Sequence, residues 1–133
     1  SGDGAPYNAC MDVNTITAQI IDAALKVHRV LGPGVLESAY EACMAIELRK
    51  RGLLVETQKP MSIVYDGVAL DMGYRLDLLV ERQIVVELKV VSKILPIHKS
   101  QLLSYLRLGG FRIGLLLNFH EALIKDGILR FAN

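Results

Sequence analysis

The sequence is poor in the features that mark secreted, membrane-spanning or disordered proteins. Its only cysteines are Cys10 and Cys43, without a Cys-x-x-Cys pair, so neither a disulfide framework nor a thiolate zinc site is expected. No apolar run approaches the ~18 residues of a membrane helix, and no basic segment precedes an apolar one at the N-terminus. Tryptophan is absent, and hydrophobic residues (52%) far outnumber charged ones (22%). These absences predict a globular protein of the reducing cytoplasm.

At 133 residues the chain is long enough for one domain and too short for two complete cores. Residues 1–12 are small, polar and aperiodic, with Met11 as a candidate for the original start. We therefore expect residues 1–13 to form a flexible extension, vector-derived in part. Residues 14–133 are expected to form a single domain.

Charge is unevenly distributed, although the formal net charge is only +1. Residues 1–87 carry 8 Lys and Arg against 12 Asp and Glu, whereas residues 88–133 carry 7 against 2. This asymmetry predicts a face that attracts anions. The alternative is accidental unevenness of a solvated surface.

The spacing of apolar residues predicts an α/β (mixed α+β) domain in which helices cover a sheet. Helices are expected over residues 15–31, 36–51 and 96–108, each of which ends at a glycine. Strands are expected where short β-rich runs are separated by turn residues such as Asp66-Gly67. These runs are residues 53–58, 61–65, 68–71, 74–80, 84–91, 111–118 and 127–131, and Gly73 marks either a break or a bulge before the fourth of them.

The most informative residues are Asp77, Glu87 and Lys89, which interrupt apolar runs. Side chains alternate across a strand, so Glu87 and Lys89 share one face. A three-residue loop at residues 81–83 would place Asp77 directly opposite Glu87, whereas a two-residue loop would place them on opposite faces. Facing carboxylates repel, and a divalent cation such as magnesium or manganese would reverse that repulsion. The alternative is a weak ion pair on an edge strand.

Two further groups of residues could belong to the same site. Glu37 lies in the first turn of the second helix, with Tyr40 on the same side. A glutamate there also simply favours the helix dipole. The third helix contains no acidic residue and carries Lys99, with Gln101 and Tyr105 four residues apart on one face. Its alternative interpretation is an ordinary solvated face.

Taken together, four motifs resemble those of the GxxExxY protein family, which is assigned to the PD-(D/E)xK, restriction-endonuclease-like nuclease superfamily. The motifs are VHRVLGPGVLESAY (27–40), YRLD (74–77), VELK (86–89) and HKSQLLSYL (98–106). The resemblance covers residues 14–132. It implies a central mixed sheet flanked by helices in αβββαβ order, with an extra N-terminal helix.

The resemblance also implies residue roles. Asp77, Glu87 and Lys89 correspond to the catalytic signature, and Glu37 joins Asp77 and Glu87 as a metal ligand. One departure is Leu76 in place of the proline of the signature; this departure is common in the superfamily and removes no ligand. Three residues of the third helix would position the nucleic acid; these are Lys99, Gln101 and Tyr105. His28, before the Gly-Pro-Gly turn, stays outside this set because a histidine near a helix C-terminus usually makes a favourable dipole contact.

The function that the resemblance implies is Mg²⁺- or Mn²⁺-dependent hydrolysis of DNA phosphodiester bonds, in repair or defence, with RNA as an alternative substrate. The competing interpretation is a catalytically silent nuclease-fold protein that binds nucleic acid or acts as a regulatory homo-oligomer. A homodimer is the expected assembly, because the apolar fraction is high and two-fold dimers are the commonest oligomers. No membrane partner is expected.

Overall fold

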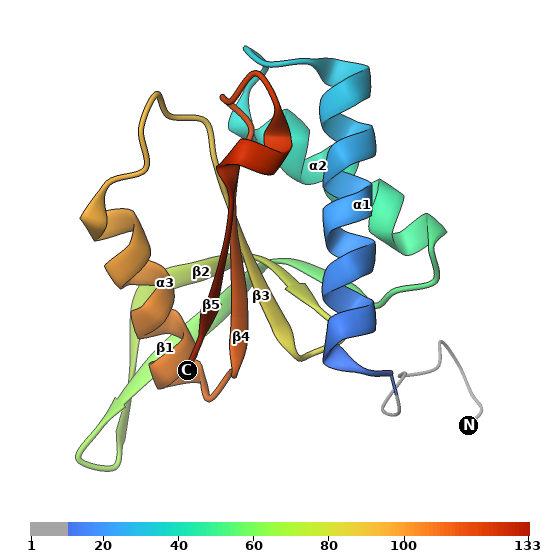
Figure 1. Ribbon diagram of the computed structural model, residues 1–133. Coiled ribbons are helices and arrows are strands. Elements are labelled where there is room, and N and C mark those ends of the chain that lie inside the picture. The colour runs from blue at the N-terminus through green and yellow to red at the C-terminus, as the bar shows by residue number, and fades with distance from the viewer. Residues whose placement is uncertain (1–10) are drawn as a thin grey trace.

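Helices cover both faces of one mixed sheet in the computed structural model, which describes residues 11–133 (Figure 1). The elements are α1 (Val13–Leu31), α2 (Glu37–Lys50), β1 (Val55–Tyr65), β2 (Val68–Val80), β3 (Ile84–Lys89), α3 (Pro96–Gly109), β4 (Ile113–Asn118), the 3₁₀ helix η1 (Ile124–Gly127) and β5 (Ile128–Ala132). Residues 1–10 of the expected extension lie outside the described residues. The first helix begins at Val13, two residues earlier than expected.

The strands between residues 55 and 132 follow the spatial order β1-β2-β3-β4-β5. Strands β3 and β4 are parallel, because α3 crosses over between them, and the other neighbouring pairs are antiparallel. From α2 to β4 the order is αβββαβ, and α1 is the additional helix. The expected restriction-endonuclease-like fold class is therefore confirmed.

Strand β3 is the centre of the sheet and is buried on both faces. On one face Val86 and Leu88 pack in the core that α1 and α2 cover. On the other face Val85 packs against the core that α3 covers. Any charged side chain on this strand is therefore surrounded by apolar layers, which is costly unless the charge is paired.

The expected strand break at residues 59–60 is wrong, because β1 is continuous; of the two alternatives at Gly73, a break or a bulge, β2 shows the bulge. Pro60 is tolerated because β1 is an edge strand with a neighbour on one side only. At Gly73, with φ of 76°, the pairing shifts from Met61–Tyr74 to Ile63–Leu70, so this glycine marks a bulge.

Smaller differences concern the ends of the later strands. The fifth expected strand stops at residue 89 instead of 91, and the next starts at residue 113 instead of 111. The short helix η1 was not expected. The Asp66-Gly67 hairpin turn is confirmed, with positive φ at both residues.

Tyr40 fixes the turn between α1 and α2. Its ring is fully buried and stacks on Phe119 with 4.4 Å between centroids. Its hydroxyl donates to the Gly32 carbonyl and accepts from the Val35 N–H at 3.3 Å. Both bonds hold the Gly-Pro-Gly turn from which α2, and with it Glu37, departs. Tyr40, the last residue of the motif at residues 27–40, therefore has a structural role.

We predict that Tyr40→Phe lowers the free energy of unfolding by about 1 kcal/mol, because the Gly32 carbonyl loses its donor. The melting temperature should fall by a few degrees. The matched control is Tyr65→Phe, since Tyr65 is exposed at the hairpin tip. Equal melting temperatures for Tyr40→Phe and Tyr65→Phe would contradict this role.

Candidate functional site

The candidate site lies where β2 and β3 stop pairing. The ladder between these strands begins with Val80 opposite Ile84 and ends with Leu78 opposite Val86. This register confirms the three-residue loop at residues 81–83. It leaves Asp77 and Glu87 facing each other directly beyond the last ladder pair.

Backbone N–H groups hold both carboxylates in place. The Asp77 N–H donates to Glu87 Oε2 at 3.0 Å, and the Leu88 N–H donates to Asp77 Oδ2 at 2.9 Å. Each carboxylate thus accepts a hydrogen bond from a backbone N–H of the opposite strand. In a regular ladder a backbone carbonyl oxygen would accept that bond. Both side chains are thereby fixed in the gap between the strands.

Burial strongly perturbs this carboxylate pair. Glu87 is 6% exposed, and burial, followed by the charge of Asp77, raises its pKa to about 8. Burial also raises the pKa of Asp77, against the lowering effects of the Leu88 N–H and the Lys89 ammonium. At neutral pH, with no cation bound, the pair therefore retains a proton.

Lys89 lies beside the pair, as the alternation along β3 predicts. Its ammonium lowers the pKa of Asp77, Glu87 and Glu37. In each case the lowering is smaller than the rise caused by burial. Lys89 therefore offsets part of the clustered negative charge without neutralising it.

Helix α2 brings further acidic side chains to the site. Burial raises the pKa of Glu37, and the nearby charge of Asp77 raises it further. One turn later, Glu41 accepts a hydrogen bond from Gln58 Nε2 at 2.7 Å, and Gln58 Nε2 also lies 3.4 Å from Asp77 Oδ1. The helix and β1 are thus joined to Asp77 through Gln58.

Sequence reasoning missed Glu41 and Gln58. The signal for Glu41 was its position four residues after Glu37, on the same side of the helix. Gln58 has no such signal, because its importance comes from an unusual backbone conformation. Gln58 has a φ of 49° although it lies within β1, and its two neighbours in the strand pair with the residues on either side of Asp77. Such strain at a non-glycine residue is typical of functional sites.

The donor set suits a hard divalent cation, because it consists of carboxylate oxygens. Within residues 11–133, however, no three Asp, Glu, His or Cys side chains come close enough together to enclose an ion. A hydrogen bond joins the Asp77 N–H to the Glu87 carboxylate, whereas Glu37 lies near them but not close enough to complete a three-carboxylate metal site. Of the three expected ligands, two therefore form a pair and the third is within electrostatic range.

Of the three α3 residues that were expected to position the nucleic acid, two line a groove beside the carboxylate pair and one does not. Tyr105 is buried beside the carboxylate pair: burial raises its pKa, and the charges of Glu87 and Asp77 raise it further. Gln101 lines the same groove of about 350 Å³ as Tyr105 and Tyr74. Lys99 is exposed on the helix and does not line this groove.

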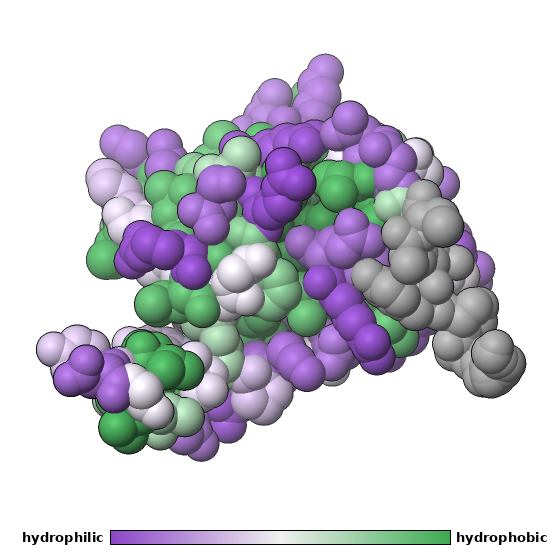
Figure 2. All heavy atoms as spheres, turned by 90° about the horizontal axis from the view of Figure 1, so that it is seen from below, coloured by the Kyte–Doolittle hydropathy of each residue, from purple (hydrophilic) through white to green (hydrophobic). Residues whose placement is uncertain are grey.

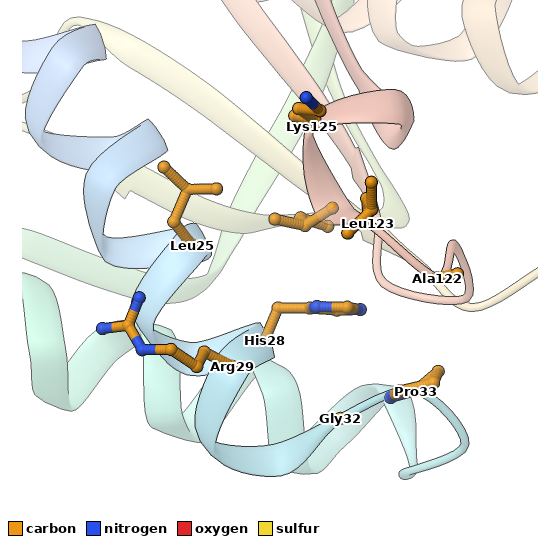
Figure 3. Close-up of a pocket in the computed structure, with 9 residues that line it drawn as sticks. Leu25, His28, Arg29, Gly32, Pro33, Ala122, Leu123 and Lys125 are labelled. Atoms are coloured by element: carbon orange, nitrogen blue, oxygen red, sulfur yellow. The ribbon is translucent and has the colours of Figure 1, made fainter.

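A separate pocket of about 490 Å³ lies between the end of α1 and the segment around η1 (Figure 3). The His28 side chain points into this pocket, and its Nε2 atom lies 2.8 Å from the Glu121 carbonyl oxygen. None of the site residues described above lines this pocket. His28 therefore ties α1 to the C-terminal segment, away from the carboxylate pair.

Comparisons with known proteins agree with this geometry. A model of the PD-(D/E)XK nuclease superfamily matches residues 14–131. No curated protein and no solved structure matches the chain significantly. Between residues 11 and 133, no helix has the length and apolar content that crossing a membrane requires.

The buried pair predicts how stability depends on pH when a chelator removes all divalent ions. Glu87 binds its proton more tightly in the folded chain, where its pKa is about 8, than at its ordinary value of 4.5. Its contribution to the free energy of unfolding is therefore greatest below pH 4.5 and is lost as pH rises towards 8. Melting temperatures in chelator should thus be lower at pH 8.5 than at pH 5.5.

The Glu87→Gln protein separates this effect from all other titrations, because it cannot ionise at this position. Its melting temperature should fall less between pH 5.5 and 8.5 than that of the wild type. Identical pH profiles for the two proteins would show that Glu87 ionises normally.

Proposed function

Because the chain belongs to the PD-(D/E)XK nuclease superfamily, we propose that it is a metal-dependent nuclease that hydrolyses phosphodiester bonds of DNA. The observation that carries this proposal is the interlocked pair of Asp77 and Glu87 beside Lys89. Nucleases of this superfamily generally use divalent metal ions. The motifs at residues 27–40 and 98–106 further support membership of the GxxExxY branch.

The proposed metal ligands are Asp77, Glu87 and Glu37. Each of the paired carboxylates uses one oxygen on a backbone N–H, and its second oxygen can face a cation. Bound Mg²⁺ or Mn²⁺ would supply Lewis-acid activation of water and phosphate. Burial and, after it, the charge of Asp77 raise the pKa of Glu87, and a bound cation would oppose both effects by favouring the ionised carboxylate.

The remaining residues have roles that follow from their charge and position. The Lys89 ammonium can stabilise negative charge that develops on the phosphate, or orient the attacking water. Gln58 and Glu41 hold the Asp77 carboxylate in one orientation through their hydrogen bonds. The α3 residues Lys99, Gln101 and Tyr105 would position the nucleic-acid strand. We place this activity in the cytoplasm, in DNA repair or defence.

We predict that Glu87→Gln and Lys89→Ala each reduce cleavage of DNA by at least ~100-fold, because each removes a charge at the reacting phosphate. The assay offers plasmid, linear duplex and single-stranded DNA with Mg²⁺ or Mn²⁺, and chelator should abolish cleavage. The matched control is Asp66→Asn, which removes one negative charge at the hairpin tip, where asparagine suits the turn.

Titration calorimetry with Mn²⁺ assigns the two roles independently of activity. Glu87→Gln should weaken Mn²⁺ binding, whereas Lys89→Ala should not, because an ammonium cannot be a ligand. Equal affinities in wild type and Glu87→Gln would contradict the metal site. If the wild type binds DNA but cleaves none of the three substrates, the chain is a catalytically silent binding module instead.

We also propose that the protein forms a homodimer through the tip of the β1–β2 hairpin. Val64, Tyr65, Val68 and Met72 are each more than half exposed there. The tip carries Asp66 and no basic residue, so its apolar surface suits a protein better than nucleic acid. Sedimentation should show a dimer for the wild type and a monomer for Val64→Lys. A wild-type monomer at all concentrations contradicts this assembly.

A further inference from the structure

A groove opens between the β1–β2 hairpin and α3, next to the carboxylate pair. Its lining includes Tyr74 from the hairpin and, from α3, Ile97, Gln101, Ser104, Tyr105 and Leu108. Figure 2 shows the hairpin projecting at the lower left, with a recess between it and the rest of the molecule. The groove measures about 350 Å³, within the range of small-ligand sites.

Two tyrosines give the groove an aromatic wall. Tyr74 lies on β2, three residues before Asp77, and is 37% exposed. Its ring meets Tyr105 edge-on, with 6.0 Å between centroids. The charges of Glu87 and Asp77 act on Tyr105, so the aromatic wall lies within electrostatic range of the carboxylate pair. An aromatic face that is left open beside such a site offers a stacking surface.

The polar groups of the groove suit a neutral heterocycle that is attached to a phosphate. None of the described residues that line it is acidic, and Ser100, Ser104 and Gln101 supply hydrogen-bond donors and acceptors. Helix α3 contributes the exposed cations Lys99 and Arg107 and contains no Asp or Glu. A phosphate backbone could therefore follow α3 while one base enters the groove.

We propose that this groove binds one unpaired nucleobase of a single-stranded substrate, with Tyr74 as its stacking platform. The inference rests on the proposed nuclease function and specifies its substrate class. A base in a duplex is paired and stacked on its neighbours, so it cannot enter a groove of this size. Single strands, flaps and frayed ends bind here, and intact duplex binds through α3 alone.

The test measures binding in chelator, where cleavage cannot proceed, with 12-nucleotide single strands that carry 2-aminopurine and with the matching duplex. DNA and RNA strands are compared, because stacking does not depend on the sugar. Tyr74→Ala should weaken single-strand binding about 10-fold and abolish the fluorescence quenching that stacking causes. Tyr74→Phe should retain both, and duplex affinity should change less than about 2-fold.

The matched control is Leu70→Ala, which removes an exposed apolar side chain from the same strand, outside both the groove and the proposed dimer surface. It should leave single-strand binding unchanged. Equal losses for Leu70→Ala and Tyr74→Ala would overturn the proposal, since the hairpin would then act as a whole. A loss that is equal for duplex and single strand would overturn it as well.

Two further measurements keep the result interpretable. Tyr74→Leu preserves apolar contact without an aromatic face, so it replaces Tyr74→Ala if that variant melts early, and retained quenching would then contradict stacking. Cleavage by Glu87→Gln tests the nuclease function separately. If Glu87→Gln cleaves like the wild type, the nuclease proposal fails whatever Tyr74 does. If only the Tyr74 variants behave differently from the prediction, the proposed nuclease function is retained and the nucleobase site is rejected.

Discussion

The arrangement of this protein depends on the two hydrogen bonds that replace the end of the β2–β3 ladder. Backbone donors must be satisfied wherever water is excluded, and here carboxylates satisfy them. The same two bonds fix the functional side chains and close the gap between the strands. Removing either carboxylate therefore affects both local structure and chemistry. The apolar layers on both faces of β3 supply the dry surroundings that make the electrostatic effects large.

The sequence was sufficient to predict what depends on local spacing. Alternation along β3, together with the length of one loop, predicted that Asp77 and Glu87 would face each other. Helix boundaries followed from glycines and apolar periodicity. The continuity of β1 did not follow, because a proline indicates a break unless the strand is known to lie at an edge, and at Gly73 the sequence left a break and a bulge equally open. That knowledge depends on sheet order, which local composition does not contain.

The contributions of Gln58 and Tyr40 show a second limit. A positive φ at glutamine arises from the surrounding packing, so no propensity indicates it. Tyr40 was associated with Glu37 by spacing, yet it acts on the preceding turn and on Phe119, nearly eighty positions further along the chain. In both cases the residue was visible in the sequence, but its partner was remote. Gln58 was missed for this reason, whereas Glu41 had a local signal in its spacing from Glu37.

The proline in β1 has a consequence for the behaviour of the protein at high concentration. An edge strand of 11 residues exposes unpaired backbone groups that another molecule's strand could extend. Pro60 removes a donor midway along this edge, and the bulge at Gly73 twists the pair beyond it. Sheet growth from one molecule to the next is thereby interrupted in the middle of its longest free edge. The irregularities that obscured β1 and β2 in the sequence thus protect the folded protein from fibrous aggregation.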